Sequence, residues 1–98
     1  MRAEMPSQML FKVAVDCSDA IAMKYSKVPS ETASAVVDAA LLKCEAKWQA
    51  AAEQSVIENG KRVQDINGSS LYREILDAAQ KMYRKSATIL VFELRSLN

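Results

Sequence analysis

The sequence predicts an all-α protein: a three-helix bundle with a long central helix and up-down-up connectivity. Apolar residues recur at steps of three and four in three long segments, and this spacing places them along one face of a helix. Only two glycines and two prolines occur among 98 residues, which favours a few long elements over the many turns of a β-sandwich. The length suits one domain, which we expect to span residues 1–98.

The first helix is expected from about residue 6 to residue 25. Pro6 suits the first turn of a helix, and Pro29 disfavours helical geometry at the residue before it, so the helix ends ahead of that proline. Its apolar face is formed by Leu10, Val13, Ala14, Cys17, Ala20, Ile21 and Tyr25. A strand over 10–15 is the alternative, because β-branched and aromatic side chains are dense there.

The second helix is expected from about residue 31 to residue 59. Ser30 is its candidate N-cap, and the acid Glu31 in the first turn is favoured by the helix dipole. Asn59 and Gly60 tolerate the left-handed backbone that closes many helices. Its apolar stripe consists of Val37, Leu41, Cys44, Trp48, Ala51 and Ser55. Trp48 lies in the middle of this stripe, so we expect it to be buried.

The third helix is expected from about residue 71 to residue 96, with Ser70 as its candidate cap. Its apolar face is formed by Leu76, Ala79, Tyr83, Ala87, Leu90, Leu94 and Leu97. Residues 88–94 have a strand-like composition, which leaves a strand as the alternative there. No helix breaker separates this segment from the periodic residues before it, so we favour the helix.

The inventory of reactive side chains argues against an enzyme. The chain has no histidine, only two cysteines, and carboxylates spread at helical spacing over positions that face solvent. Its serines have no histidine to act as their base, and its two isolated glycines form no phosphate-binding loop. We therefore expect no catalytic residue, no metal site and no cofactor.

Charge and hydropathy limit the class of partner. The net charge of +1 is too small to recruit nucleic acid, and the basic cluster of Lys81, Arg84 and Lys85 is short. The apolar run over 89–92 is far below the roughly twenty residues that span a bilayer, so we expect no membrane span. No secretory signal is readable, which predicts a cytoplasmic protein; removal of a signal peptide would instead place it in the periplasm or outside the cell.

Cys17 and Cys44 come close together when the first two helices pack antiparallel, offset by about one helical turn, roughly 6 Å. Both a pair of core thiols and a disulfide fit this placement. The order of Cys17, a proline turn at 29–31 and an alanine-rich helix with Ala-Leu-x-x-Cys over 40–44 resembles small exported helical proteins of bacteria. The resemblance covers residues 17–48 and implies export, without a particular function.

A set of apolar side chains on the third helix suggests a function. Met82, Ile89 and Phe92 lie around the helix from its main apolar face. Monomers tend to avoid such an exposed patch, so we expect a homodimer that buries it, with Arg95 at the edge. The sequence therefore predicts a non-enzymatic protein-interaction module, for example an adaptor or inhibitor of another protein. The alternatives are an exported, disulfide-tied protein of the bacterial envelope and a weak binder of nucleic acid.

Overall fold

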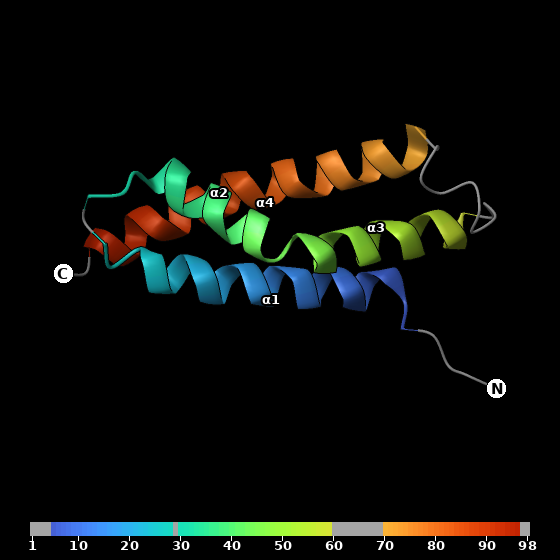
Figure 1. Ribbon diagram of the computed structural model, residues 1–98, viewed down its shortest axis with the longest axis horizontal. Helices are drawn as coiled ribbons and strands as arrows, with labels where there is room; N and C mark the ends of the chain where they lie inside the picture. The colour runs from blue at the N-terminus through green and yellow to red at the C-terminus, as the bar shows by residue number, and fades with distance from the viewer. Residues whose placement is uncertain (1–4, 29, 60–69, 97–98) are drawn as a thin grey trace.

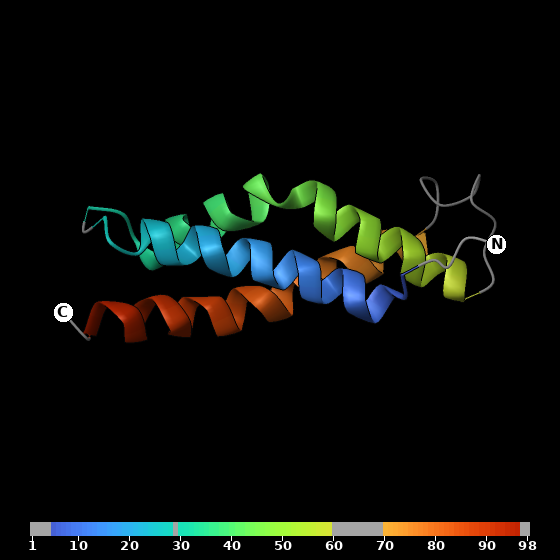
Figure 2. The same cartoon turned by 90° about the horizontal axis from the view of Figure 1, so that it is seen from below.

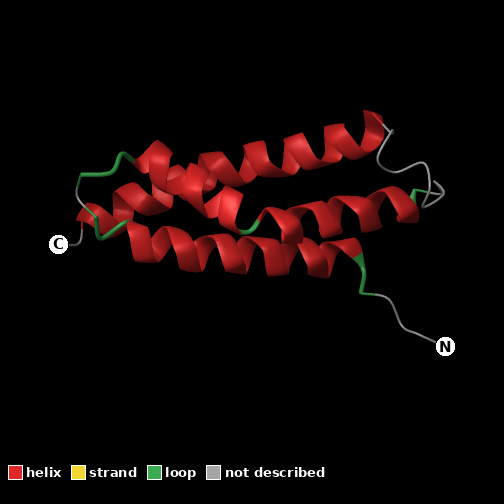
Figure 3. Cartoon of the chain, viewed as in Figure 1, coloured by secondary structure: helices red, strands yellow, loops and turns green. Residues whose placement is uncertain are grey.

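The computed structural model describes residues 5–28, 30–59 and 70–96, and in these ranges the regular structure is entirely helical. Four helices pack together: α1 (Ser7–Tyr25), α2 (Ala33–Lys43), α3 (Glu45–Glu58) and α4 (Ser70–Ser96) (Figure 1). The all-α prediction is confirmed. Residues 10–15 and 88–94, for which a strand was the alternative, both lie inside helices (Figure 3).

The helices lie lengthwise in an elongated bundle. Helices α1 and α4 run in one direction, and α2 and α3 run in the opposite direction (Figures 1 and 2). Helix α1 packs along both α2 and α3, while α4 packs on α3 with one part of its length and on α2 and α1 with another. The C-terminal end of α4 therefore lies at the same end of the bundle as the connection between α1 and α2.

The single helix expected over 31–59 is not confirmed, because the chain breaks at Cys44 into α2 and α3. Cys44 has φ −106° and ψ 14°, outside the α-helical region. Its N–H still donates to the Ala40 carbonyl, and its own carbonyl accepts from the N–H groups of Lys47 and Trp48. No proline or glycine marks this break in the sequence. It coincides with a covalent bond between Cys44 and Cys17 of α1.

The N-terminal ends of α2 and α1 are not capped by the residues that local sequence suggests. Helix α2 is capped by Thr32 and not by Ser30: the Thr32 Oγ1 accepts from the Ala35 N–H at 3.0 Å. Helix α1 begins at Ser7 without a capping side chain of its own. Instead the Glu58 carboxylate, at the end of α3, accepts from the Ser7 N–H at 2.8 Å and from the Ser7 hydroxyl at 2.6 Å. A carboxylate is well placed there because the N-terminal end of a helix is electropositive.

The core forms around Trp48, whose side chain is 1% exposed, so the prediction that it is buried is confirmed. The indole lies between two other rings, with its centroid 6.3 Å from that of Phe11 and 5.4 Å from that of Tyr83. The other fully buried apolar residues are small or β-branched: Ala14, Ala22, Val36, Val37, Ala40, Ala51, Ala52, Val56, Ala87 and Val91. Small side chains at these positions allow the helices to approach closely around one large aromatic group.

Candidate functional site

The two cysteines are joined. Cys17 of α1 and Cys44 at the α2–α3 break form a disulfide, with their Cα atoms 6.1 Å apart. The bond closes a covalent ring over residues 17–44, which contains the second half of α1 and all of α2. Of the two arrangements that fitted the sequence, the structure has the disulfide and not the pair of core thiols.

Arg95, which was expected at the edge of an interface, is engaged within the chain. Its guanidinium donates to the carbonyl of Ser26 through Nε at 3.1 Å and to the carbonyl of Val28 through an Nη atom at 3.0 Å. Arg95 thus fastens the end of α4 to the chain's own α1–α2 connection. This contact was not foreseen, because it depends on which turn lies beside the end of α4.

Met82, Ile89 and Phe92 do lie together on the outer face of α4, and we call them the α4 ridge. Their exposed fractions are 73%, 59% and 61%. The buried residues of the same helix, Tyr83, Ala87 and Val91, lie on the other side, since Val91 is roughly half a turn around the helix from Met82. One side of α4 therefore packs in the core while large apolar side chains project from the opposite side.

A groove runs beside the α4 ridge, between α1 and α4, and we call it the α1–α4 groove. It consists of two hollows of about 410 Å³ and 310 Å³ that share Val15, Tyr83 and Ser86 in their walls. The larger hollow is bordered by Met82 and reaches the edge of Trp48, and the smaller one is bordered by Ile89. Ridge and groove together give this side of the molecule a shape that a helix of another protein could follow.

Few polar side chains line the α1–α4 groove: Asp19, Tyr83, Ser86 and Glu93. The Tyr83 hydroxyl donates to the Asp19 Oδ1 at 2.8 Å, which links α4 to α1 at the floor of the groove. Burial raises the pKa of Tyr83 far above its ordinary value, and the hydrogen bond to Asp19 and the charge of that carboxylate raise it further. The phenol is therefore kept protonated as a donor, which suits a structural link.

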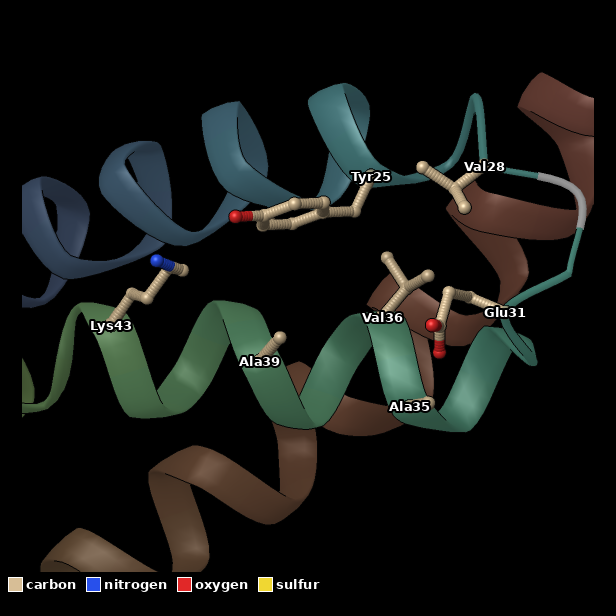
Figure 4. Close-up of a pocket in the computed structure, with 7 residues that line it drawn as sticks. All are labelled: Tyr25, Val28, Glu31, Ala35, Val36, Ala39 and Lys43. Carbon is tan, nitrogen blue, oxygen red and sulfur yellow. The ribbon is translucent and has the colours of Figure 1, made fainter.

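A further hollow, of about 320 Å³, lies between the end of α1 and α2 (Figure 4). The Tyr25 ring lies along it, and the ammonium groups of Lys24 and Lys43 are each 5.9 Å from the ring centroid. Glu31 lies at the end of this hollow opposite to Lys43, and small side chains such as Ala39 line the α2 side (Figure 4). The two opposite charges are far apart along an open slot, so they do not form an acid–base pair.

One of the three residues in the basic cluster Lys81, Arg84 and Lys85 forms an ion pair within the chain. Arg84 makes an ion pair with Asp38 of α2, next to an open hollow of about 340 Å³ that also contains the exposed Leu42. Lys81 and Lys85 are exposed on α4. Two remaining cations on a chain of net charge +1 make a small positive surface.

Across residues 5–28, 30–59 and 70–96, no three side chains of the metal-binding types come together as a possible metal site. Over the same ranges, no helix combines the length and the apolar character needed to cross a bilayer. Comparisons of the chain with models of protein families, with curated proteins and with solved structures find no match.

Several residues that hold the site together were not singled out in the sequence. Ser18 is fully buried and accepts a hydrogen bond from Trp48, while Asp19 receives the Tyr83 hydroxyl. Val91 is fully buried as well. A signal for Ser18 was present, because it lies one residue after Cys17 between two buried alanines at helical spacing, Ala14 and Ala22.

Proposed function

We propose that this chain is a non-enzymatic protein-interaction module, an adaptor or inhibitor that binds another protein through the α4 ridge and also self-associates through it. In this proposal α2 and α3 together act as the central helix of an up-down-up three-helix bundle. The partner binds the outer face of α4. The observation that carries the proposal is the exposure of Met82, Ile89 and Phe92 together on one side of a helix whose other side is core.

The chemistry of the ridge supports binding of a protein rather than a small molecule. Phenylalanine and methionine are enriched in protein interfaces, and a few such anchors supply most of the binding free energy. Met82 and Ile89 are seven residues apart, the repeat that two packed helices share. A helix lying in the α1–α4 groove would contact Met82 and Ile89, which border its two hollows, and would reach the edge of Trp48 in the larger one.

Capture from lysate tests the proposal. The chain is immobilised as wild type, as Phe92→Asp, and as Met9→Asp, in which an equally apolar and 52% exposed side chain on α1 is changed. We expect a discrete protein to be retained by the wild type and by Met9→Asp and lost from Phe92→Asp. Equal capture by all three variants, or no capture by the wild type, would count against the α4 ridge as the binding surface.

A second candidate function is favoured by the disulfide. Disulfides persist in oxidising compartments and are rare in the cytosol, so the Cys17–Cys44 bond supports an exported chain acting in the bacterial envelope. Thiol counting on the protein purified without reductant, after unfolding, tests this proposal. We expect no reactive thiol before reduction and two after it; two thiols from the outset would argue for a reducing compartment.

A further inference from the structure

We infer that a second copy of this chain is a partner of the α4 ridge, with the ridge of each copy seated in the α1–α4 groove of the other. This inference rests on the proposed function, because it specifies how self-association would use the same surface. Met82 borders the larger hollow and Ile89 borders the smaller one, so ridge and groove lie side by side along one helix. A face with a ridge beside a matching groove is complementary to a rotated copy of itself.

The symmetry of this pairing fixes the direction of the helices. Rotation about a two-fold axis parallel to α4 exchanges the two sides of the face, so each ridge meets the groove of the other copy. The two α4 helices then run parallel. An axis perpendicular to α4 would leave the sides unexchanged and would place ridge against ridge, with both grooves empty.

The dimensions agree with the parallel arrangement. The ridge spans the eleven residues from Met82 to Phe92, about 15 Å, and the α4 side of the groove spans Ala79 to Glu93, about 21 Å. Because this two-fold axis is parallel to α4, each residue of one copy lies at the same height along the helix as the same residue of the other copy. Met82 therefore faces the hollow of about 410 Å³ and Ile89 the hollow of about 310 Å³.

Charge also favours a second copy. Lys85 is exposed on α4, lies between Ile89 and Phe92 around the helix, and makes no ion pair with any residue that the structure describes. When the ridge enters the partner's groove, this side of α4 approaches the partner's α1. The α1 wall of the groove carries the Asp19 carboxylate at a matching level, where it bonds Tyr83. Each copy thus presents a cation where the other presents an acid.

Two variants separate the ridge from the groove. Phe92→Asp alters the ridge without lining either hollow, and Ser86→Arg blocks both hollows from an exposed position. We expect the wild type to sediment as a dimer of the 10.8 kDa chain at high micromolar concentration. Each variant alone should raise the dissociation constant about thirtyfold or more, because Phe92→Asp places a charge on the apolar ridge and Ser86→Arg fills the hollows that receive Met82 and Ile89. Circular dichroism checks that both variants remain helical.

Mixing the two variants gives the decisive measurement. In a mixture, the intact ridge of Ser86→Arg can enter the intact groove of Phe92→Asp, so we expect heterodimers that form more tightly than either variant with itself. The chain carrying both changes should not be rescued by either partner, and Met9→Asp should dimerise as the wild type does. A wild-type monomer at high micromolar concentration overturns the inference, while Phe92-dependent capture of another protein would leave the proposed function standing. A wild-type dimer without rescue in the mixture overturns the reciprocal seating and leaves self-association itself intact.

Discussion

The Trp48 indole donates a hydrogen bond from Nε1 to the Ser18 hydroxyl at 2.9 Å, across 30 residues of sequence and inside the core. Ser18 is 0% exposed and Trp48 is 1% exposed, so neither group can exchange this partner for water. The bond orients the indole plane between Phe11 and Tyr83, and it joins α1 to α3 at the level where α4 packs on both.

Removal of the acceptor should be costly. Ser18→Ala leaves the buried indole N–H without a partner, and we expect the free energy of unfolding to fall by about 1–3 kcal/mol. Urea unfolding followed by Trp48 fluorescence measures the loss. Ser34→Ala, at an exposed position of α2, is the matched control and should change stability by less than about 0.5 kcal/mol. Equal stabilities for the two variants would show that the bond contributes nothing net.

The disulfide should stabilise the chain chiefly by restricting its unfolded state. Cys17 and Cys44 are separated by 27 residues, and closing a loop of this length contributes about 3–4 kcal/mol in the chain-entropy model. We expect the variant Cys17→Ala with Cys44→Ala to lose about this amount in urea unfolding. Reductant should lower the stability of the wild type and leave the variant unchanged. A variant as stable as the oxidised wild type would contradict the prediction.

The contact between Glu58 and the start of α1 should make the stability of the protein depend on pH in the acid range. Hydrogen bonds from the hydroxyl and then from the N–H of Ser7 lower the pKa of this carboxyl. A lowered folded pKa means that the contribution to stability is present above the unfolded pKa and is lost as the pH falls through the folded one. Carbon NMR of the Glu58 carboxyl measures the pKa directly. We expect Ser7→Ala to raise it, because the hydroxyl donor is the larger cause; an unchanged pKa would refute the assigned bond.

Tyr83 should resist ionisation until the protein unfolds. Its pKa in the folded protein is raised, first by burial and then by Asp19. The contribution of Tyr83 to stability is therefore fully present below the pKa of tyrosine in the unfolded chain, and it is lost as the pH rises from that value through the folded pKa. The tyrosinate absorbance of wild type and Tyr83→Phe, compared through an alkaline titration, isolates this residue. We expect the difference between them to appear only together with loss of helical signal. A separate titration in the folded state would contradict the prediction.

The helices could be predicted from the sequence because their signals are local. Apolar residues at helical spacing, with few glycines and prolines, indicate a helix whatever the rest of the chain does. The same pattern placed Met82, Ile89 and Phe92 away from the main apolar face of α4, and the structure leaves these three side chains exposed. A long periodic segment contains enough information to give both its type and its orientation.

Features that depend on contact between distant residues were beyond the reach of the sequence. The break at Cys44 has no proline or glycine to mark it, and it coincides with a bond to a residue in another helix. Ser30 and Thr32 are both capable N-caps, and in the structure Thr32 caps the helix. The intrachain bonds of Arg95 could not be predicted either, because their acceptors are two backbone carbonyls that carry no signal in the sequence.

The covalent ring over residues 17–44 has a consequence for how the molecule opens. The polar ties of α4 described above end on this ring: Tyr83 on Asp19, Arg84 on Asp38, and Arg95 on the carbonyls of Ser26 and Val28. Amide exchange in native proteins proceeds through partial openings that release the least constrained segments first. With one end of α2 joined to the middle of α1, α4 can separate while the ring stays closed. The amides of α2 should then exchange most slowly, and separation of α4 would transiently expose the Trp48 indole to solvent.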